Sequence, residues 1–393
     1  MRILQVTNIV SPHQLPLARQ LTELIGSNDF RFAATAKPDQ NRNRLGWNQF
    51  IDEPWILKAG ESALDCDEFE RWWDTADVVI CGDRRFSRMQ DRLQSKKICF
   101  YMSERWWKPP IGRGRLLWPP FYNLASQFKK IAVSEYFHYL PIGVYAATDI
   151  LTLAKLNDRI WKWGYFTQTS NSFQTEVDKD LNINNASKNL KILWVGRMLN
   201  WKKIDTIIKA VGMIAKAGHS SSLTLVGIGP EKERLVQMAS RELPSGSFIF
   251  MDSMPSNEIP CLMQNHNVYV LPSSGYEGWG AVINEAMECK CAVVASRQSG
   301  AAASMITHGK NGMLFDAGDS DTLAQHLTVL ATSPSFREEL AQSGFNTIQQ
   351  LWSPRIAASR LGELSKSLIS RKEIIKYDEG PLSSAESWYR AVR

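Results

Sequence analysis

The sequence predicts an α/β protein of two domains, each with a parallel β-sheet covered by helices on both faces. The chain has 393 residues, more than one ordinary hydrophobic core accommodates. Short apolar runs alternate with helix-like stretches along the whole chain, which is typical of parallel sheets. A polar, asparagine-rich segment at 176–189 separates two such alternations. Because this segment has little to bury, we expect it to be the linker between the domains.

The hydrophobic pattern places the elements in order along the chain. In the first half, a helix is expected at 16–25, and strands are expected at 3–8, 30–35, 77–81, 97–101 and 130–133. In the second half, strands are expected at 190–195, 222–226, 248–251, 268–271 and 292–296. Helices are expected there at 203–217, 231–242, 256–264, 280–288, 322–331, 334–350 and 354–370. We therefore expect a first domain at 1–180, a second at 190–370, and a tail at 371–393 that packs back on the first domain.

Composition and charge exclude several classes of protein. Hydrophobic residues make up 44% of the chain and charged residues 22%, as in soluble globular proteins. No apolar run approaches the roughly 18 residues of a spanning helix. The first residues read as a strand and lack the pattern of a signal peptide, so we expect a cytoplasmic protein. A net charge of +6 is mild for this length and suits anionic ligands or an anionic membrane better than nucleic acid.

The segment 272–296 carries the most specific chemical pattern. A buried run ends at 271, a turn rich in glycine contains Glu277, and the following helix contains Glu285. Glycines in the turn let the backbone approach a ligand closely. The start of a helix favours an anion such as a diphosphate, here through the N–H groups of Gly280, Ala281 and Val282. Two carboxylates suit the hydroxyl groups of sugars. The alternative is a simple strand–turn–helix whose glycines only cap the helix.

Two further strand ends carry groups suited to a nucleotide. Gly196 and Arg197 directly follow one strand, and Lys202 precedes the next helix. The ends of parallel strands are where ligands bind, and these cations suit phosphate oxygens. A second glycine pair, Gly227 and Gly229, follows the next strand. On its own this pair is a weak dinucleotide signal, because arginine stands where a third glycine belongs.

Together these segments resemble family 4 of the retaining glycosyltransferases. The two glutamates, with seven residues between them in Pro-Ser-x-x-x-Glu-Gly-x-Gly…Glu-Ala-Met, are similar to the hallmark of that family. The resemblance implies that Glu277 contacts the donor sugar and Glu285 the nucleotide ribose. It also implies that the backbone between them, at Gly278, Trp279 and Gly280, supports the sugar and phosphates.

The other two segments extend the resemblance. Residues 196–203 are similar to the Gly-Arg-Leu…Lys-Gly motif of the family. This implies that Arg197 and Lys202 hold the donor diphosphate, with Lys203 standing where the family has glycine. The glycines at 227 and 229 resemble the turn that lines the nucleotide pocket. Lys290 is a second departure from a family glycine.

The resemblance implies the GT-B fold, in which two Rossmann-like domains face each other across a cleft. It implies hexosyl transfer from a nucleotide-diphosphate sugar to a hydroxyl acceptor, with retention of anomeric configuration, as in polysaccharide biosynthesis. No metal or other cofactor is expected. Two Asp-x-Asp triplets, at 65–67 and 319–321, precede helix-like segments, so we interpret them as caps rather than metal ligands.

The acceptor is expected on the first domain. Glu104 follows a strand and is a candidate acceptor contact; a salt bridge to Arg105 is an equal alternative. His13 follows the first strand and is a second candidate, or a plain loop histidine. Residues 105–130 contain no acidic residue and combine lysine and arginine with tryptophan. Such a composition suits an anionic bilayer and a lipid-linked saccharide acceptor. The alternative is a basic loop over buried tryptophans.

Three other functions stay open at this level. A glycoside hydrolase would use two carboxylates, but it would leave the cations at 197 and 202 without a purpose. A non-catalytic protein would bind the nucleotide-sugar without turnover. A dehydrogenase would need a better glycine fingerprint than 227–229. Nucleic-acid binding would rest on the basic stretch alone and is the least favoured.

Overall fold

The computed structural model describes residues 1–37, 53–168, 189–386 and 388. The chain divides into two compact units, each described here by itself. Unit 1 comprises Met1–Thr167 and Leu351–Arg393, and unit 2 comprises Gln168–Gln350. The expected linker at 176–189 lies outside the described residues, apart from Asn189. No helix within the described ranges is both long enough and apolar enough to cross a bilayer.

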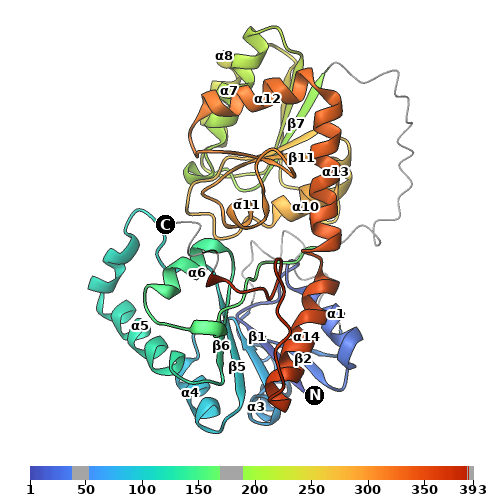
Figure 1. Cartoon of the computed structure of the whole chain (residues 1–393). Coiled ribbons are helices and arrows are strands. Elements are labelled where there is room, and N and C mark those ends of the chain that lie inside the picture. Colours follow the sequence, from blue (N-terminus) through green and yellow to red (C-terminus); the bar gives the residue numbers. More distant parts are fainter. Residues whose placement is uncertain (38–52, 169–188, 387, 389–393) are drawn as a thin grey trace. The chain divides into compact units, whose positions relative to one another are not determined.

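Unit 1 is built on a parallel sheet, shown with its flanking helices in Figure 1. Within the described residues its strands are β1 Ile3–Thr7, β2 Phe30–Ala34, β3 Ile56–Leu57, β4 Val78–Cys81, β5 Ile98–Ser103 and β6 Phe137–Pro141, in the order β3-β2-β1-β4-β5-β6. Its helices are α1 Leu15–Ile25, α3 Ala63–Thr75, α4 Phe86–Gln94, α5 Pro119–Ala132, α6 Val144–Leu151 and α14 Pro354–Ser370, with short 3₁₀ turns η1 Gly112–Leu117 and η2 Asn157–Arg159.

Unit 2 repeats the same plan. Its strands, in the part of the unit that is described, are β7 Leu190–Val195, β8 Ser221–Val226, β9 Phe248–Met251, β10 Val268–Leu271, β11 Ala292–Ser296 and β12 Met313–Phe315, in the order β12-β11-β10-β7-β8-β9. Its helices are α7 Ile204–Lys216, α8 Lys232–Glu242, α9 Ile259–Gln264, α10 Val282–Glu288, α11 Gly300–Met305, α12 Ser320–Thr332 and α13 Pro334–Gln350, with the 3₁₀ turn η5 Asn200–Lys202.

Both sheets have the strand order of a Rossmann fold. The strand pairs are parallel in both units, as expected for apolar strands buried on both faces. The order reverses between β1 and β4 in unit 1 and between β7 and β10 in unit 2. Such a reversal leaves a crevice at the carboxyl ends of the two strands, where ligands bind in this class of fold. The prediction of two Rossmann-like domains is confirmed; the cleft expected between them stays a prediction.

The strand expected at 130–133 is wrong. These residues end helix α5 or follow it directly, and the strand lies later, at β6. The helix forms because its buried residues recur at helical spacing: Phe121, Ala125, Phe128, Ile131 and Ala132. In the sequence, the short apolar run at its end could not be distinguished from a strand without these more distant partners.

The boundary of the second unit also differs from the expected 190–370. Helix α14 belongs to unit 1 and packs against α1. Gly362 gives α1 room, because a Cβ there would lie 2.8 Å from Leu24 Cδ2. The chain after α14 then pairs with unit 1: the N–H of Leu382 donates to the carbonyl of Lys162 at 2.9 Å, and that of Ala385 to Ile160 at 3.1 Å. Helix packing and backbone pairing thus place residues 351–386 with the first half of the chain.

Candidate donor and acceptor sites

The loops after β7 and β10 meet at the strand reversal of unit 2. The backbone N–H of Ser274 donates to the carbonyl of Trp201 at 2.9 Å and so ties the two loops together. Across this junction, Lys202 Nζ lies 2.5 Å from Glu277 Oε2. Their side chains are only 14% and 13% exposed. The structure therefore brings together two of the residues expected at the donor site, from segments 75 positions apart.

Two aromatic residues that the sequence analysis did not single out flank this ion pair. Lys202 Nζ lies 4.6 Å from the centre of the Trp201 ring, a cation–π contact. The rings of Trp201 and Tyr276 are 6.2 Å apart. Each aromatic residue directly precedes one member of the pair in the sequence. An aromatic residue next to each charged residue was the signal that the sequence offered. It points to a shared site only once the two loops are known to be in contact.

Glu285 lies in α10, on the helix that follows the Glu277 turn. The helix begins at Val282, slightly later than expected. Burial raises the pKa of the Glu285 carboxyl to about 7. The buried Tyr269, on β10, also has a raised pKa, first through burial and further through the negative charges of Glu285 and Glu277. The charges of both glutamates therefore raise the pKa of the same buried tyrosine, so both lie in the same part of unit 2.

The two glycine turns expected at the nucleotide pocket fit against each other. The N–H of Gly196 donates to the carbonyl of Val226 at 3.0 Å, at the ends of β7 and β8. A Cβ on Gly227 would lie 1.8 Å from the Gly196 carbonyl oxygen, and one on Gly229 would lie 2.3 Å from that of Met198. Glycine is required at both positions because backbone from the neighbouring turn occupies the space of a side chain.

Arg197 lies beside Gly196 at this edge of the sheet, and its side chain is exposed. It forms no ion pair with any residue that the structure describes. The guanidinium therefore remains available to an anion, whereas the ammonium of Lys202 is already held by Glu277.

The residues between the two glutamates contribute mainly backbone. The Trp279 side chain is buried, and its indole N–H donates to Asn284 Oδ1 at 2.9 Å. Gly280 has a φ of +91°, and a Cβ there would lie 2.9 Å from Leu271 Cδ2. Gly278 is approached closely by helix α11, since a Cβ on Gly300 would lie 2.1 Å from the Gly278 carbonyl oxygen. Ala281 is buried and Val282 half-buried at the start of α10.

The Asp-x-Asp triplets lie at helix starts. Asp319 precedes α12 and accepts the N–H of Thr322 at 2.9 Å, which is the cap predicted for it. Asp65 lies in the first turn of α3, where Ser62 is the cap; Asp65 instead accepts the N–H of Lys58 at 2.7 Å.

Unit 1 has a polar pocket of about 280 Å³ at its own strand reversal, which we call the unit 1 pocket. It is lined from the ends of β1, β4, β5 and β6 and from later loops, by Thr7, Asn8, Gln14, Gly82, Arg84, Tyr101, Met102, Ser103, Glu104, Arg105, Trp106, Lys108, Ile142 and Tyr165. The position matches the crevice at which ligands bind in this class of fold.

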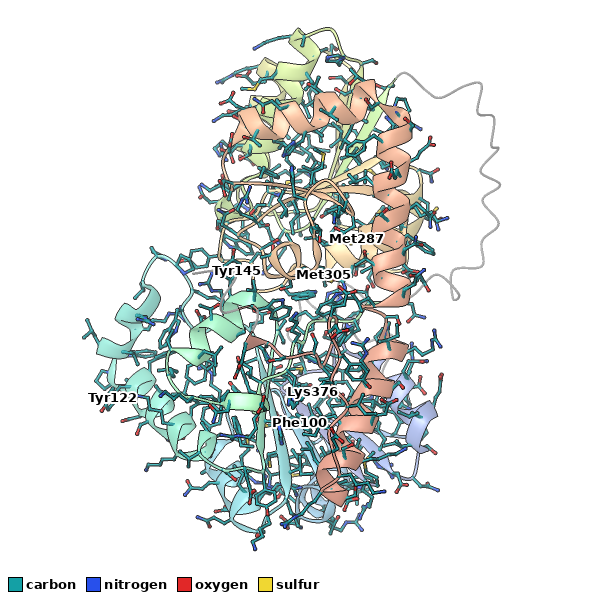
Figure 2. All side chains as sticks on the ribbon, in the orientation of Figure 1. Phe100, Tyr122, Tyr145, Met287, Met305 and Lys376 are labelled. Carbon is teal, nitrogen blue, oxygen red and sulfur yellow. The ribbon has the colours of Figure 1, made fainter. Side chains whose placement is uncertain are left out.

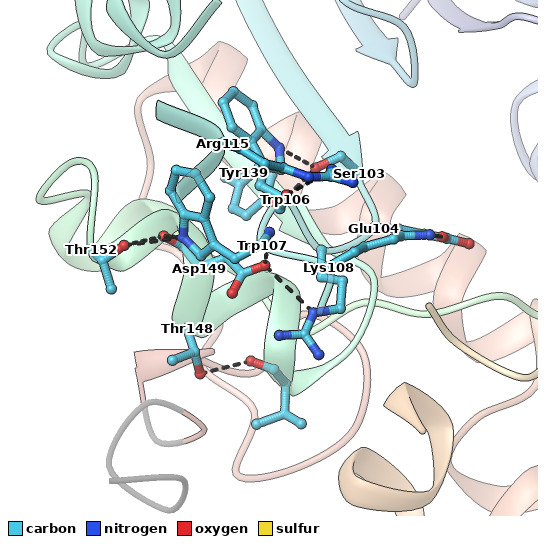
Figure 3. Close-up of polar contacts among 12 residues, drawn as sticks. Ser103, Glu104, Trp106, Trp107, Lys108, Arg115, Tyr139, Thr148, Asp149 and Thr152 are labelled. Carbon is cyan, nitrogen blue, oxygen red and sulfur yellow. Dashed lines mark hydrogen bonds and ion pairs between the residues drawn. The ribbon is translucent and has the colours of Figure 1, made fainter. Parts of the chain in front are cut away.

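Glu104 lies in this pocket and is held by two partners. Its Oε2 is 3.2 Å from Lys108 Nζ, and its Oε1 accepts the Tyr165 hydroxyl at 3.2 Å. Figure 3 shows Glu104 and Lys108 side by side. Arg105, the alternative partner, instead has its Nε 3.8 Å from Asp149 Oδ2. The predicted acceptor contact therefore faces a cavity, in an ion pair with Lys108.

His13 lies in the loop between β1 and α1. Its ring centre is 6.2 Å from that of Tyr165, which lines the unit 1 pocket. Burial lowers the pKa of His13 to about 4, so the imidazole is neutral at pH 7. His13 contacts a lining residue but is not itself among the residues that line the pocket.

The basic, aromatic stretch 105–130 separates into buried and exposed parts. Trp106 and Trp107 are buried, and the Trp107 N–H donates to Asp149 Oδ2 at 2.8 Å (Figure 3). Leu117 and Trp118 are by contrast 89% and 62% exposed. Tyr122 is also exposed and projects from α5 in Figure 2. The alternative of buried tryptophans thus holds for the first pair, while an exposed apolar surface follows it.

The second half of the chain is similar in sequence to known glycosyltransferases. The family model described as Glycosyl transferases group 1 matches residues 176–347. A GDP-mannose-dependent alpha-(1-6)-phosphatidylinositol monomannoside mannosyltransferase of Mycolicibacterium smegmatis is 28% identical over 179 residues, which are 44% of this chain and 47% of the relative. The capsular polysaccharide biosynthesis glycosyltransferase CapM of Staphylococcus aureus is 23% identical over 208 residues, 53% of each chain. The alignments span about half the length of these curated relatives.

Solved structures share the fold over nearly the whole chain. Anabaena Alr3699/HepE, crystallised with UDP, has a TM-score of 0.69 at 17% identity and covers 93% of this chain and 100% of its own. Sucrose-phosphate synthase of Thermosynechococcus elongatus has a TM-score of 0.67 at 17% identity and covers 95% and 100%. The chain therefore has the two-domain α/β fold of these proteins, of the GT-B type.

Proposed function

We propose, from the membership of residues 176–347 in the group 1 glycosyl transferases, that this chain is a glycosyltransferase that uses a nucleotide-sugar donor. The observation that carries the proposal is the ion pair between Lys202 and Glu277, with Arg197 at the same edge of the sheet. A sugar–nucleotide bond breaks with negative charge building on the diphosphate. Fixed cations at that position stabilise the transition state without reorganisation.

The ion pair of Lys202 and Glu277 suits both the diphosphate and the sugar of the donor. An ammonium has three N–H donors, and the bond to Glu277 uses one of them. We propose that the other donors, with Arg197, face the diphosphate, while Glu277 accepts hydroxyl groups of the sugar. Glu285 takes the ribose hydroxyls, and the backbone of the glycine turns lies against the phosphates. The leaving phosphate itself accepts the proton of the acceptor, so no dedicated base and no metal are required.

The acceptor we propose is a hydroxyl of a glycan or a lipid-linked saccharide, bound in the unit 1 pocket near Glu104. Retention of anomeric configuration is part of the proposal and follows from the resemblance to family 4. NMR of the product distinguishes it directly, because the one-bond C–H coupling constant at the anomeric carbon differs between axial and equatorial anomeric protons. An inverted product from a donor of known configuration would rule out retention.

Two variants test the assignment of the donor site. We expect Arg197→Ala and Glu277→Ala each to lower transfer at least about 100-fold, the loss typical of removing one group that stabilises developing charge. Release of nucleoside diphosphate from a panel of UDP- and GDP-sugars measures the rate. Arg241→Ala, an exposed arginine on α8, is the matched control. Full activity in both site variants, with a native melting temperature, would refute the assignment.

The same assay separates the other functions. A glycoside hydrolase would release free sugar from a glycoside without any nucleotide. A nucleotide-sugar sensor would bind the donor, seen as a rise in melting temperature, yet would release no diphosphate with any acceptor.

We also propose that the exposed part of 105–130 docks on an anionic membrane, as a peripheral contact of a cytoplasmic protein. Leu117 and Trp118 project with Ile111 and Tyr122 from η1 and the start of α5, beside Arg113. Exposed tryptophan next to basic residues suits the boundary between headgroups and acyl chains.

Flotation with vesicles tests this docking. The wild type is expected to float with vesicles containing phosphatidylglycerol, more strongly at low salt, and not with neutral vesicles. The double variant Leu117→Ser, Trp118→Ser is expected to stay at the bottom. Leu64→Ser, which changes another highly exposed leucine, on α3, should float like the wild type. If the wild type does not float at either salt concentration, the proposed membrane docking is wrong.

A further inference from the structure

The unit 1 pocket has an excess of positive charge among its lining residues. Arg84, Arg105 and Lys108 contribute three cations, and Glu104 contributes a single carboxylate. Lys108 and Glu104 offset each other, since their charged atoms are 3.2 Å apart. Arg105 has a carboxylate partner outside the lining, Asp149, so Arg84 is the lining cation that no described carboxylate offsets. The other lining residues are uncharged, so the excess positive charge of the lining comes from its arginines.

The two arginines are held differently. Arg84 is exposed and forms no ion pair with any residue within the described ranges. Arg105 is 14% exposed; its Nε is 3.8 Å from Asp149 Oδ2, and its Cζ lies 5.0 Å from the centre of the Tyr145 ring. Asp149 is buried behind Arg105 and is not among the lining residues. Arg105 is therefore held by a carboxylate and a ring outside the pocket lining, whereas Arg84 extends from the turn after β4 as an exposed side chain.

The remaining lining groups suit the hydroxyls of a saccharide. Glu104 Oε1 accepts the Tyr165 hydroxyl, and Ser103 Oγ is 2.9 Å from the Tyr139 hydroxyl. A carboxylate and a serine hydroxyl offer acceptors for sugar hydroxyls, whereas guanidinium groups offer donors in a fork that matches an oxyanion. At about 280 Å³ the cavity is at the lower end of the range of small-molecule pockets.

On the basis of the proposed transferase function, we propose that the unit 1 pocket selects an acceptor that carries an oxyanion, a phosphate or a carboxylate, next to the hydroxyl that receives the sugar. Arg84 and Arg105 hold the oxyanion, and Glu104 faces the hydroxyls. A neutral saccharide would leave the Arg84 guanidinium, which lines the pocket, without an anion, and this disfavours its binding.

Calorimetric titration of the full chain with three small probes tests this proposal. Glucose 6-phosphate, glucuronate and glucose share a sugar ring and differ in charge, so the first two distinguish phosphate from carboxylate. We expect at least one anionic probe to bind at least about 10-fold more tightly than glucose, a factor that corresponds to one charge-assisted contact. Arg84→Gln should remove that preference and Arg84→Lys should restore part of it. Arg71→Gln, an exposed arginine of α3, should not change it.

Further variants separate this pocket from the donor site. Arg197→Ala should leave the affinity for the anionic probes unchanged and should weaken the binding of UDP or GDP, whichever the wild type binds. Equal affinities for all three probes would overturn the proposal. So would a loss of probe binding in Arg197→Ala but not in Arg84→Gln, since the oxyanion would then lie in unit 2. A loss of nucleotide affinity in Arg84→Gln as large as that for the probes would assign these arginines to the donor diphosphate instead.

If the nucleotide fails to bind and the anionic probes still distinguish Arg84→Gln from the wild type, the proposed transferase function fails and the oxyanion site stands. Arg84 is exposed, so its variants are expected to fold. The conclusion therefore does not depend on a variant of the more buried Arg105.

Discussion

At the scale of a single residue, Glu285 shows how burial changes the pKa of a side chain proposed to bind the donor. Its carboxyl lies on a helix whose other side chains fill the core of unit 2, and burial raises its pKa from the ordinary 4.5 to about 7. Near neutral pH a carboxyl with this pKa is present in both its protonated and its ionised form. Ribose hydroxyls donate better to the ionised form, so we expect nucleotide affinity to increase as the pH rises through 7.

The same shift gives a stability prediction with a definite sign. Between pH 4.5 and about 7 the folded protein keeps the Glu285 proton that the unfolded chain has lost. The folded state then binds more protons, so this residue makes the free energy of unfolding fall as the pH rises through that window. Denaturant titrations at several pH values should show a shallower fall for Glu285→Gln than for the wild type. Glu339→Gln, at an exposed site on α13, should leave the slope unchanged; a slope equal in all three proteins would contradict the assignment.

At the scale of elements, helix α7 begins in an unusual way. Lys203 precedes the helix with φ +53°, in the left-handed region. Lys290, before β11, has φ +57°. These are the two positions at which the chain has lysine where family 4 has glycine. At both positions the backbone of this chain is left-handed, which favours glycine and costs a residue with a Cβ about 1–2 kcal/mol.

Lys203→Gly is therefore expected to stabilise unit 2. Relief of the left-handed conformation exceeds the extra freedom of glycine in the unfolded chain, and the net gain should be about 0.5–1 kcal/mol. Lys209→Gly, an exposed lysine in the middle of the same helix, should cost about 1 kcal/mol instead. Chemical denaturation measures both. Lys290→Gly should change stability less than Lys203→Gly, because it also removes the cation–π contact of Lys290 Nζ with Phe345, 4.9 Å from its ring centre.

At the scale of the whole molecule, the chain carries two Rossmann-like units with separate cores. The residues proposed to hold the donor nucleotide all belong to unit 2, whereas the unit 1 pocket is lined by unit 1 alone. A ligand that binds the folded state stabilises the unit that holds it. The two sites are therefore expected to respond separately to heat.

Scanning calorimetry of the full chain should show this separation. A nucleoside diphosphate at 100 times its dissociation constant should stabilise the unit 2 transition by about 2.7 kcal/mol and leave the unit 1 transition in place. Lys209→Gly identifies the unit 2 transition, because it should lower that transition alone. A nucleotide that shifts only the transition unaffected by Lys209→Gly would show that the donor site has been assigned to the wrong unit.

Much of this arrangement followed from the sequence because its signals are local. Strands such as those at 190–195 and 268–271 are continuous apolar runs, and they lie where expected. Glu277 and Lys202 follow two strands that are neighbours in any Rossmann sheet, so their meeting was foreseeable from topology. The Trp201 and Tyr276 rings beside them were missed, since aromatic residues next to a charge carry no signal until the two loops are in contact.

The sequence by itself determined the class of fold, the two halves of the chain and the segments that carry the donor chemistry, because short apolar runs and glycine turns are set by neighbouring residues. Only the tertiary structure decided which charges meet. It paired Glu104 with Lys108 rather than Arg105, buried Trp106 while exposing Trp118, and placed α14 with the first unit. Each of these outcomes depends on packing between residues far apart in the chain, and burial, which sets the strength of every charge, exists only once that packing is complete.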